Sequence, residues 1–268
     1  MTLGEFALLF GAGVGAGVFG STAGLASLAS YPALLLVGLP PVVANVTNTV
    51  GLLGSSVGAV AGSRRELRGQ WTILRRLLPV AVAGGLVGAV LLLVGPPDAF
   101  AHIVPYLVAA ASLLLILSPR IRTAVLVRRV RRSAGRPDAA GARPDGAGMR
   151  PDGGALVVLL VFLTGIYGGY FGAAAGVVVL AVLLSLTDRS LPVANALKNV
   201  LLGCANGIAA VVFVITADVA WAAVPALFLG CVLGGRIGPA LVRRIPPTLL
   251  RWVIGLAGLV LAVQLWLD

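Results

Sequence analysis

Long apolar stretches alternate with short polar loops along almost the whole chain. Eight stretches can be distinguished, covering roughly residues 3–38, 40–62, 77–95, 101–118, 155–187, 191–217, 219–241 and 251–267. A helix rises ~1.5 Å per residue, so about 20 residues cross the ~30 Å hydrocarbon layer of a membrane. The pattern therefore predicts an all-α polytopic membrane protein.

Two of these stretches, 3–38 and 155–187, are too long for one membrane span. Each contains a glycine cluster near its middle, where a helix is most easily interrupted. We predict that each long stretch forms a hairpin of two helices, giving about 8 to 10 membrane segments in all. Whether the hairpin arms cross fully or re-enter stays open. The glycines expected at the breaks are Gly17, Gly20, Gly24, Gly169, Gly172 and Gly176.

The two glycine clusters are copies of one repeated segment. Gly13, Gly17, Phe19, Gly20 and Gly24 recur 152 residues later as Gly165, Gly169, Phe171, Gly172 and Gly176. The runs that follow also match, PVVANVTN from residue 41 and PVANALKN from residue 192. We predict a first transmembrane repeat at 1–118, a polar linker at 119–154 and a second repeat at 155–268. The linker holds nine arginines and three Arg-Pro-Asp tripeptides, too polar a composition for a core.

The basic loops indicate that the two repeats are inverted. In the first half, loop 63–76 carries five arginines and the next loop, PPDAFAH, carries none. In the second half the order reverses, because 216–220 has no basic residue and 243–251 has three arginines. Cytoplasmic loops are enriched in Lys and Arg, so equivalent loops lie on opposite sides and the linker is expected in the cytoplasm. Inverted repeats with interrupted helices are typical of secondary transporters.

Composition excludes several other classes of protein. Hydrophobic residues make up 59% of the chain and charged residues only 11%, whereas a soluble domain carries about 25% charged residues. The net charge of +11 is concentrated in a few loops, which favours a topology signal over a nucleic-acid-binding surface. Two cysteines and one histidine offer no metal site, and no nucleotide-binding or hydrolase motif occurs. We therefore expect no enzyme activity, cofactor, metal or nucleic acid.

Lys198 is the only lysine, and it lies inside an apolar run. A charge at this depth costs several kcal/mol unless it faces water, a partner or a substrate. Helical spacing places it on one face with Asn195, Asn199 and Asn206. This face is a candidate substrate-binding site. The alternative is that Lys198 extends to a helix end or pairs with an acid such as Asp218.

The first half offers a neutral counterpart to this face. Asn45, Thr47 and Asn48 occupy the repeat-equivalent run, with Ser55 and Ser56 two turns later. Amides and hydroxyls can donate hydrogen bonds to a small oxyanion. They can equally hold helices together, and the glycines can serve close packing or free backbone amides at a helix break.

The order and duplication of these motifs resemble the sulfite exporter TauE/SafE family. The resemblance rests on the glycine-rich opening of each half, on the two Asn-containing runs with Asn206 downstream, and on LGGRIGPALVRRIPP at 233–247. It implies a permease for small sulfur-containing anions, such as sulfite or organosulfonates, in a bacterial inner membrane. The expected partners are the anion and the lipid bilayer. The sequence does not decide whether the chain forms a homo-oligomer.

The mechanism that we expect is alternating access around a midplane site. Lys198 would be the electrostatic anchor, and the donors would be Asn45, Thr47, Asn48, Asn195 and Asn199. The alternative is a passive channel for small anions or neutral solutes, which the paired helix breaks disfavour because they suit a closed site.

Overall fold

The computed structural model describes residues 1–134, 154–187 and 189–241, with single positions between 252 and 266. These parts are helical and contain no strand, which confirms the predicted all-α class. The predicted span 251–267, the basic loop 243–251 and most of the linker lie outside the fully described ranges. The helices are α1 Leu3–Ala23, α2 Ser27–Leu36, α3 Pro41–Gly62, α4 Arg64–Leu67, α5 Trp71–Val94, α6 Pro97–Ala134, α7 Gly154–Tyr170, α8 Ala175–Leu186, α9 Leu191–Thr216 and α10 Val224–Leu241.

Local sequence signals mark the helix starts. α1 begins with a capping box, in which Thr2 and Glu5 each accept a hydrogen bond from the other's backbone N–H. α3 and α9 each carry a proline in the first turn, where the missing N–H is not needed. Three helices, α1, α5 and α9, are long and apolar enough to cross a membrane by length and composition.

Both long apolar stretches form the predicted hairpins, but most of the expected glycines are not at the breaks. α1 ends at Gly24, whose left-handed φ of 77° glycine adopts without strain. The second break covers residues 171–174, where Gly172 and Ala174 have φ of 75° and 62°. The other four glycines lie within helices, so their assignment to the breaks was wrong: Gly17 and Gly20 in α1, Gly169 in α7 and Gly176 in α8.

These four glycines serve close packing instead. A methyl group added at Gly17 would collide with the backbone of α10, and one added at Gly169 would collide with the backbone of α5. One added at Gly20 would lie 2.7 Å from the hydroxyl oxygen of Ser55 on α3. Small residues at these positions let helix backbones approach each other, as is common in membranes.

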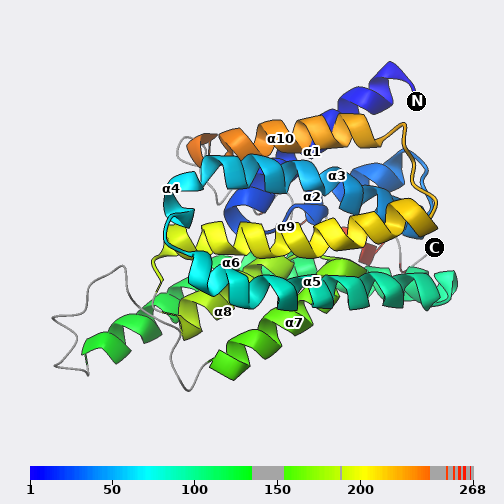
Figure 1. The fold of residues 1–268 in the computed structure, drawn as a ribbon. Coiled ribbons are helices and arrows are strands. Elements are labelled where there is room, and N and C mark those ends of the chain that lie inside the picture. The colour runs from blue at the N-terminus through cyan, green and yellow to red at the C-terminus, as the bar shows by residue number, and fades with distance from the viewer. Residues whose placement is uncertain are drawn as a thin grey trace.

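The first hairpin enters and leaves at one end of the bundle (Figure 1). α1 and α3 both run parallel to α10, since Gly13 and Gly51 pack near Leu227 while Gly17 and Gly58 pack near Gly235. α2 runs back along α3 toward the start of that helix, where the Tyr31 hydroxyl donates to the Pro41 carbonyl. The tip of the hairpin therefore lies inside the bundle.

The second half repeats this arrangement in the opposite direction. α7 runs along α5 as α1 runs along α10, and α9 packs on α5 as α3 packs on α10. α3 and α9 are antiparallel, because Ser56 meets Gly203 while Thr47 meets Ala220 beyond the end of α9. The hairpin tips touch at Gly24 and Gly176, which are repeat equivalents. The two hairpins therefore meet at their tips.

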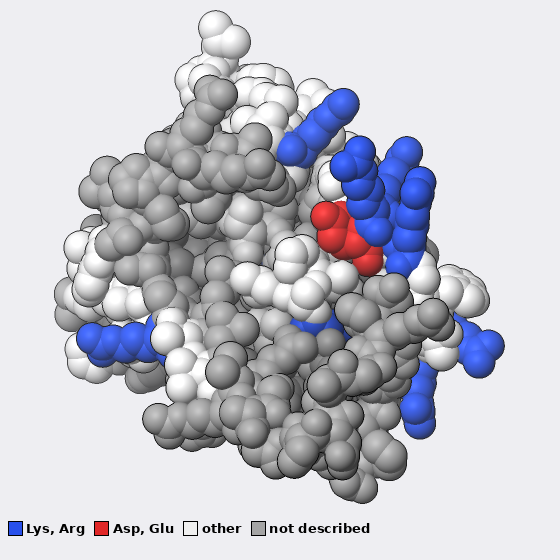
Figure 2. All heavy atoms as spheres, turned by 90° about the vertical axis from the view of Figure 1, so that its left-hand side faces the viewer, with Lys and Arg blue, Asp and Glu red and all other residues white. Residues whose placement is uncertain are grey.

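Basic side chains gather at the end of the bundle where α4 joins α3 to α5. Figure 2 looks onto this end and shows a group of basic side chains beside acidic ones. The arginines between α3 and the first turns of α5 are all exposed: Arg64, Arg65, Arg68, Arg75 and Arg76. α6 returns to the same end and continues past residue 118, the predicted end of the first repeat, to Ala134. The division into repeats and linker stays a prediction.

Candidate functional site

A cavity of about 50 Å³ lies where the two hairpin breaks meet α3 and α9. Four separate parts of the chain supply its walls: the end of α1 with the start of α2, the middle of α3, the break before α8, and α9. This is the place where inverted-repeat transporters hold their substrates. The lining residues are Gly20, Gly24, Ala26, Ser27, Leu52, Ser55, Ser56, Gly172, Asn199, Leu202 and Asn206.

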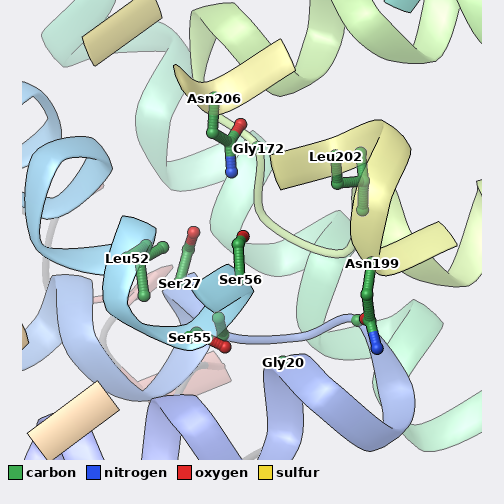
Figure 3. A pocket seen from close by; sticks show the side chains of 11 residues that line it. Gly20, Ser27, Leu52, Ser55, Ser56, Gly172, Asn199, Leu202 and Asn206 are labelled. Atoms are coloured by element: carbon green, nitrogen blue, oxygen red, sulfur yellow. The ribbon is translucent and has the colours of Figure 1, made fainter. Parts of the chain in front are cut away.

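Three of the lining side chains present polar atoms to the cavity (Figure 3). The hydroxyls of Ser27 and Ser56 and the amide nitrogen of Asn206 point into it, whereas the hydroxyl of Ser55 points away. The Asn206 carbonyl oxygen is buried and has no hydrogen-bond partner among the described residues. The arrangement can therefore offer an oxyanion three hydrogen-bond donors.

Lys198 lies behind this wall rather than in it. Its side chain is 0% exposed, and its ammonium donates to the carbonyl of Gly20 at 3.0 Å. Gly20 itself lines the cavity, so the ammonium binds the backbone of a residue in the cavity wall. The last turn of a helix carries partial negative charge, which stabilises a cation there.

Two specific arrangements do not fit this position of Lys198, namely a side chain that extends out of the bundle and pairing with Asp218. Complete burial is incompatible with a side chain that extends to the membrane surface. Asp218 follows the far end of α9, about 27 Å of helix away from Lys198.

The other predicted ligands on α3 and α9 mainly bind backbone groups of neighbouring elements. The amide of Asn195 donates to the Ser21 carbonyl at 2.9 Å, and the amide of Asn199 donates to the same oxygen at 3.3 Å. Asn45, the repeat equivalent of Asn195, donates to the Tyr170 carbonyl at 2.8 Å. The amides of Asn195 and Asn199 on α9 thus bind the last turns of α1, and the amide of Asn45 on α3 binds the end of α7.

Thr47 and Asn48 are also engaged away from the cavity. The Thr47 hydroxyl accepts from the Ala220 N–H at 3.0 Å, and the Asn48 carbonyl oxygen accepts from the Ser30 hydroxyl at 2.5 Å. Both side chains are buried. In this structure Thr47 and Asn48 therefore join neighbouring segments of the bundle, which is one of the two roles considered for them.

The structure divides the predicted residues into two groups. Those in the cavity wall are Asn199, Asn206, Gly20, Gly24 and Gly172. Those outside it are Asn45, Thr47, Asn48, Asn195, Lys198, Gly17, Gly169 and Gly176. Sequence reasoning missed Ser27, although it is the first polar residue after the Gly24 break and could have been found for that reason. Within the described residues, no group of three or more His, Cys, Asp or Glu side chains could hold a metal ion.

Comparison with known proteins gives a consistent family. The family model described as "Sulfite exporter TauE/SafE" matches residues 9–265. The "Probable membrane transporter protein YfcA" of Escherichia coli K12 is 28% identical over 97% of this chain and 89% of that protein. A "Probable membrane transporter protein" of Haemophilus influenzae is 25% identical, over 98% and 94% respectively. No solved structure matches the chain significantly. Because the family model spans nearly the whole length, the chain belongs to the sulfite exporter TauE/SafE family.

Proposed function

We propose that this protein is a secondary transporter of small anions, with sulfite or organosulfonates as the substrate class. The observation that carries the proposal is the cavity at the meeting point of two inverted hairpins, with three hydrogen-bond donors directed into it. The family description and the relatives' names, a sulfite exporter and membrane transporters, support the same function.

The proposed mechanism is alternating access. The end of α1 and the tip of the first hairpin form one side of the site, and the break before α8 forms the other. Rocking of the two halves about the Gly24–Gly176 contact would open the cavity first to one side of the membrane and then to the other. Ser27, Ser56 and Asn206 would bind the anion, while Lys198 would supply positive charge from behind the Gly20 carbonyl.

We further propose that the arginine-rich end faces the cytoplasm of a bacterial cell, with the linker on the same side. Excess arginine at one end of the bundle supports this orientation. Labelling of a cysteine introduced at Arg65, and of one introduced at Asp218, in intact cells tests it. A membrane-impermeant maleimide should label only the cysteine at 218.

Flux measurements in proteoliposomes test transport itself. Radiolabelled sulfite uptake should saturate with concentration and should be stimulated by unlabelled sulfite on the opposite side. Asn206→Leu should reduce this flux strongly, because it removes a donor from the cavity. Thr216→Val is the matched control, since Thr216 lies at the exposed end of the same helix. Flux that rises linearly with the gradient would favour the channel alternative, and no anion flux at all would contradict the proposal.

A further inference from the structure

The cavity wall has an apolar part as well as a polar one. Besides the donors of Ser27, Ser56 and Asn206, the wall includes the side chains of Leu52 on α3 and Leu202 on α9. Three glycines and one alanine add backbone and a single methyl group, but no polar side chain. A bound anion therefore meets two kinds of surface.

The two leucines lie on opposite sides of the donors. Leu52 precedes Ser56 by one turn of α3, and Leu202 precedes Asn206 by one turn of α9. Because α3 and α9 are antiparallel, these preceding turns lead toward opposite ends of the bundle. Figure 3 shows Leu52 on the left and Leu202 on the right, with the three donors between them. The leucines thus bracket the polar part of the cavity.

The remaining polar side chains of the wall are directed elsewhere. The hydroxyl of Ser55 points away from the cavity (Figure 3), and the amide of Asn199 donates to the Ser21 carbonyl at 3.3 Å. Neither side chain adds a donor to the three that converge on the cavity. A part of the substrate that contacts the leucines therefore meets hydrocarbon.

The cavity is also small. Its volume of about 50 Å³ has room for roughly three to five water molecules, at about 10–15 Å³ for each. An ion of the size of sulfite or methanesulfonate fills such a space. A longer substituent would have to displace one of the leucines.

We infer that Leu52 and Leu202 are specificity-determining residues, which restrict the substrate to an oxyanion whose remaining substituent is small and apolar. This inference rests on the proposed function and narrows its substrate class. The three oxygens of a sulfonate can accept from the three donors, and the fourth substituent of the sulfur then faces the leucines. A methyl group gains from burial there, whereas a polar group loses its hydrogen bonds to water. Sulfite fits as well, because its sulfur carries only a lone pair at this position.

Uptake of three singly charged anions into proteoliposomes with the wild-type protein tests this selection. Methanesulfonate and sulfamate have the same shape but carry a methyl and an amino group respectively, and propanesulfonate extends the methyl group to a propyl chain. At equal subsaturating concentration, the flux of methanesulfonate should exceed that of each other anion about tenfold or more. Equal fluxes would overturn the inference and leave the proposed function standing. No flux of these anions or of sulfite would overturn both.

Enlarging the cavity gives a second measurement. Leu52→Ala and Leu202→Ala should each raise the ratio of propanesulfonate flux to methanesulfonate flux about tenfold. Val57→Ala and Val211→Ala are the matched controls, because these side chains are exposed on the same two helices, and they should leave the ratio unchanged. An unchanged ratio in a folded leucine variant would overturn the role of that leucine. If neither leucine variant folds, the wild-type comparison still decides the question.

Discussion

The two hairpins share a repeated sequence but end their first helices differently. α1 continues to Ala23 and breaks at Gly24, whereas α7 ends at Tyr170. With the repeat offset of 152 residues, α7 ends five residues before the position that corresponds to Ala23. The end of α1 receives three donors from α9, one of them charged: Asn195, Lys198 and Asn199. The end of α7 receives one neutral donor from α3, the amide of Asn45.

The second hairpin compensates with a contact of its own. The Tyr167 hydroxyl donates to the Ala173 carbonyl at 2.6 Å within the break, and the repeat-equivalent position in the first half is Gly15. Hydrogen bonds from α9 of the opposite half thus hold the end of α1 next to the first break. The second break has in addition a hydrogen bond within its own hairpin. The two hairpins therefore adopt different local conformations of one repeated motif.

The contact between the hairpin tips should be the most sensitive point of this comparison. Gly24→Ala introduces a left-handed alanine, which costs about 1–3 kcal/mol, and also forces the new methyl group onto the backbone of Gly176. We expect a large drop in thermal unfolding temperature and loss of sulfite flux. Gly38→Ala is the control, because Gly38 has φ of 83° and open space around it. Equal effects of the two substitutions would show that the tip contact contributes nothing.

The amides that fix the two hairpin ends should differ in importance. Asn45→Ala leaves the Tyr170 carbonyl without its side-chain donor, and we expect a loss of about 1–3 kcal/mol in the free energy of unfolding. Asn195→Ala should cost less than about 1 kcal/mol, because the Asn199 amide still donates to the Ser21 carbonyl. Chemical unfolding in detergent measures both. A larger loss for Asn195→Ala than for Asn45→Ala would mean that the Asn199 amide does not replace the Asn195 amide at the Ser21 carbonyl.

The Tyr167 hydroxyl, which bonds within the second break, should contribute less than the Asn45 amide. Tyr167→Phe removes one hydrogen bond, for an expected loss of about 0.5–1.5 kcal/mol, and should speed amide hydrogen exchange at residues 171–174. Tyr31→Phe is the matched change in the first hairpin, where the bond is 3.5 Å long and near the limit for a hydrogen bond. We expect that variant to match the wild type within error, and a comparable loss there would contradict the assignment.

Much of the architecture could be predicted from local properties of the chain. Stretch length and hydropathy identify the helices, and the all-α class is confirmed. The glycine clusters predict two hairpins, and the chain folds as two hairpins in opposite directions. These features depend on the number of residues that cross the membrane and on backbone conformation, and both can be judged from neighbouring residues.

The break positions could not be predicted in the same way. Six glycines in two clusters offer similar flexibility, and only Gly24 and Gly172 adopt a left-handed conformation. The remainder are selected by contact with α5, α10, Ser55 or the opposite hairpin, which local sequence does not reveal. Close packing and chain reversal favour the same residue type, so composition alone cannot separate them.

The sequence by itself showed that Lys198 lies inside an apolar run and that polar residues recur in the two matching segments that form α3 and α9. Tertiary structure decided what each of them contacts. The Gly20 carbonyl that binds Lys198 is 178 residues away in the chain, and Ser27, Ser56 and Asn206 reach one cavity from three different helices. Helical periodicity gives the face of a helix on which a side chain lies, but the partner on that face depends on how distant segments pack.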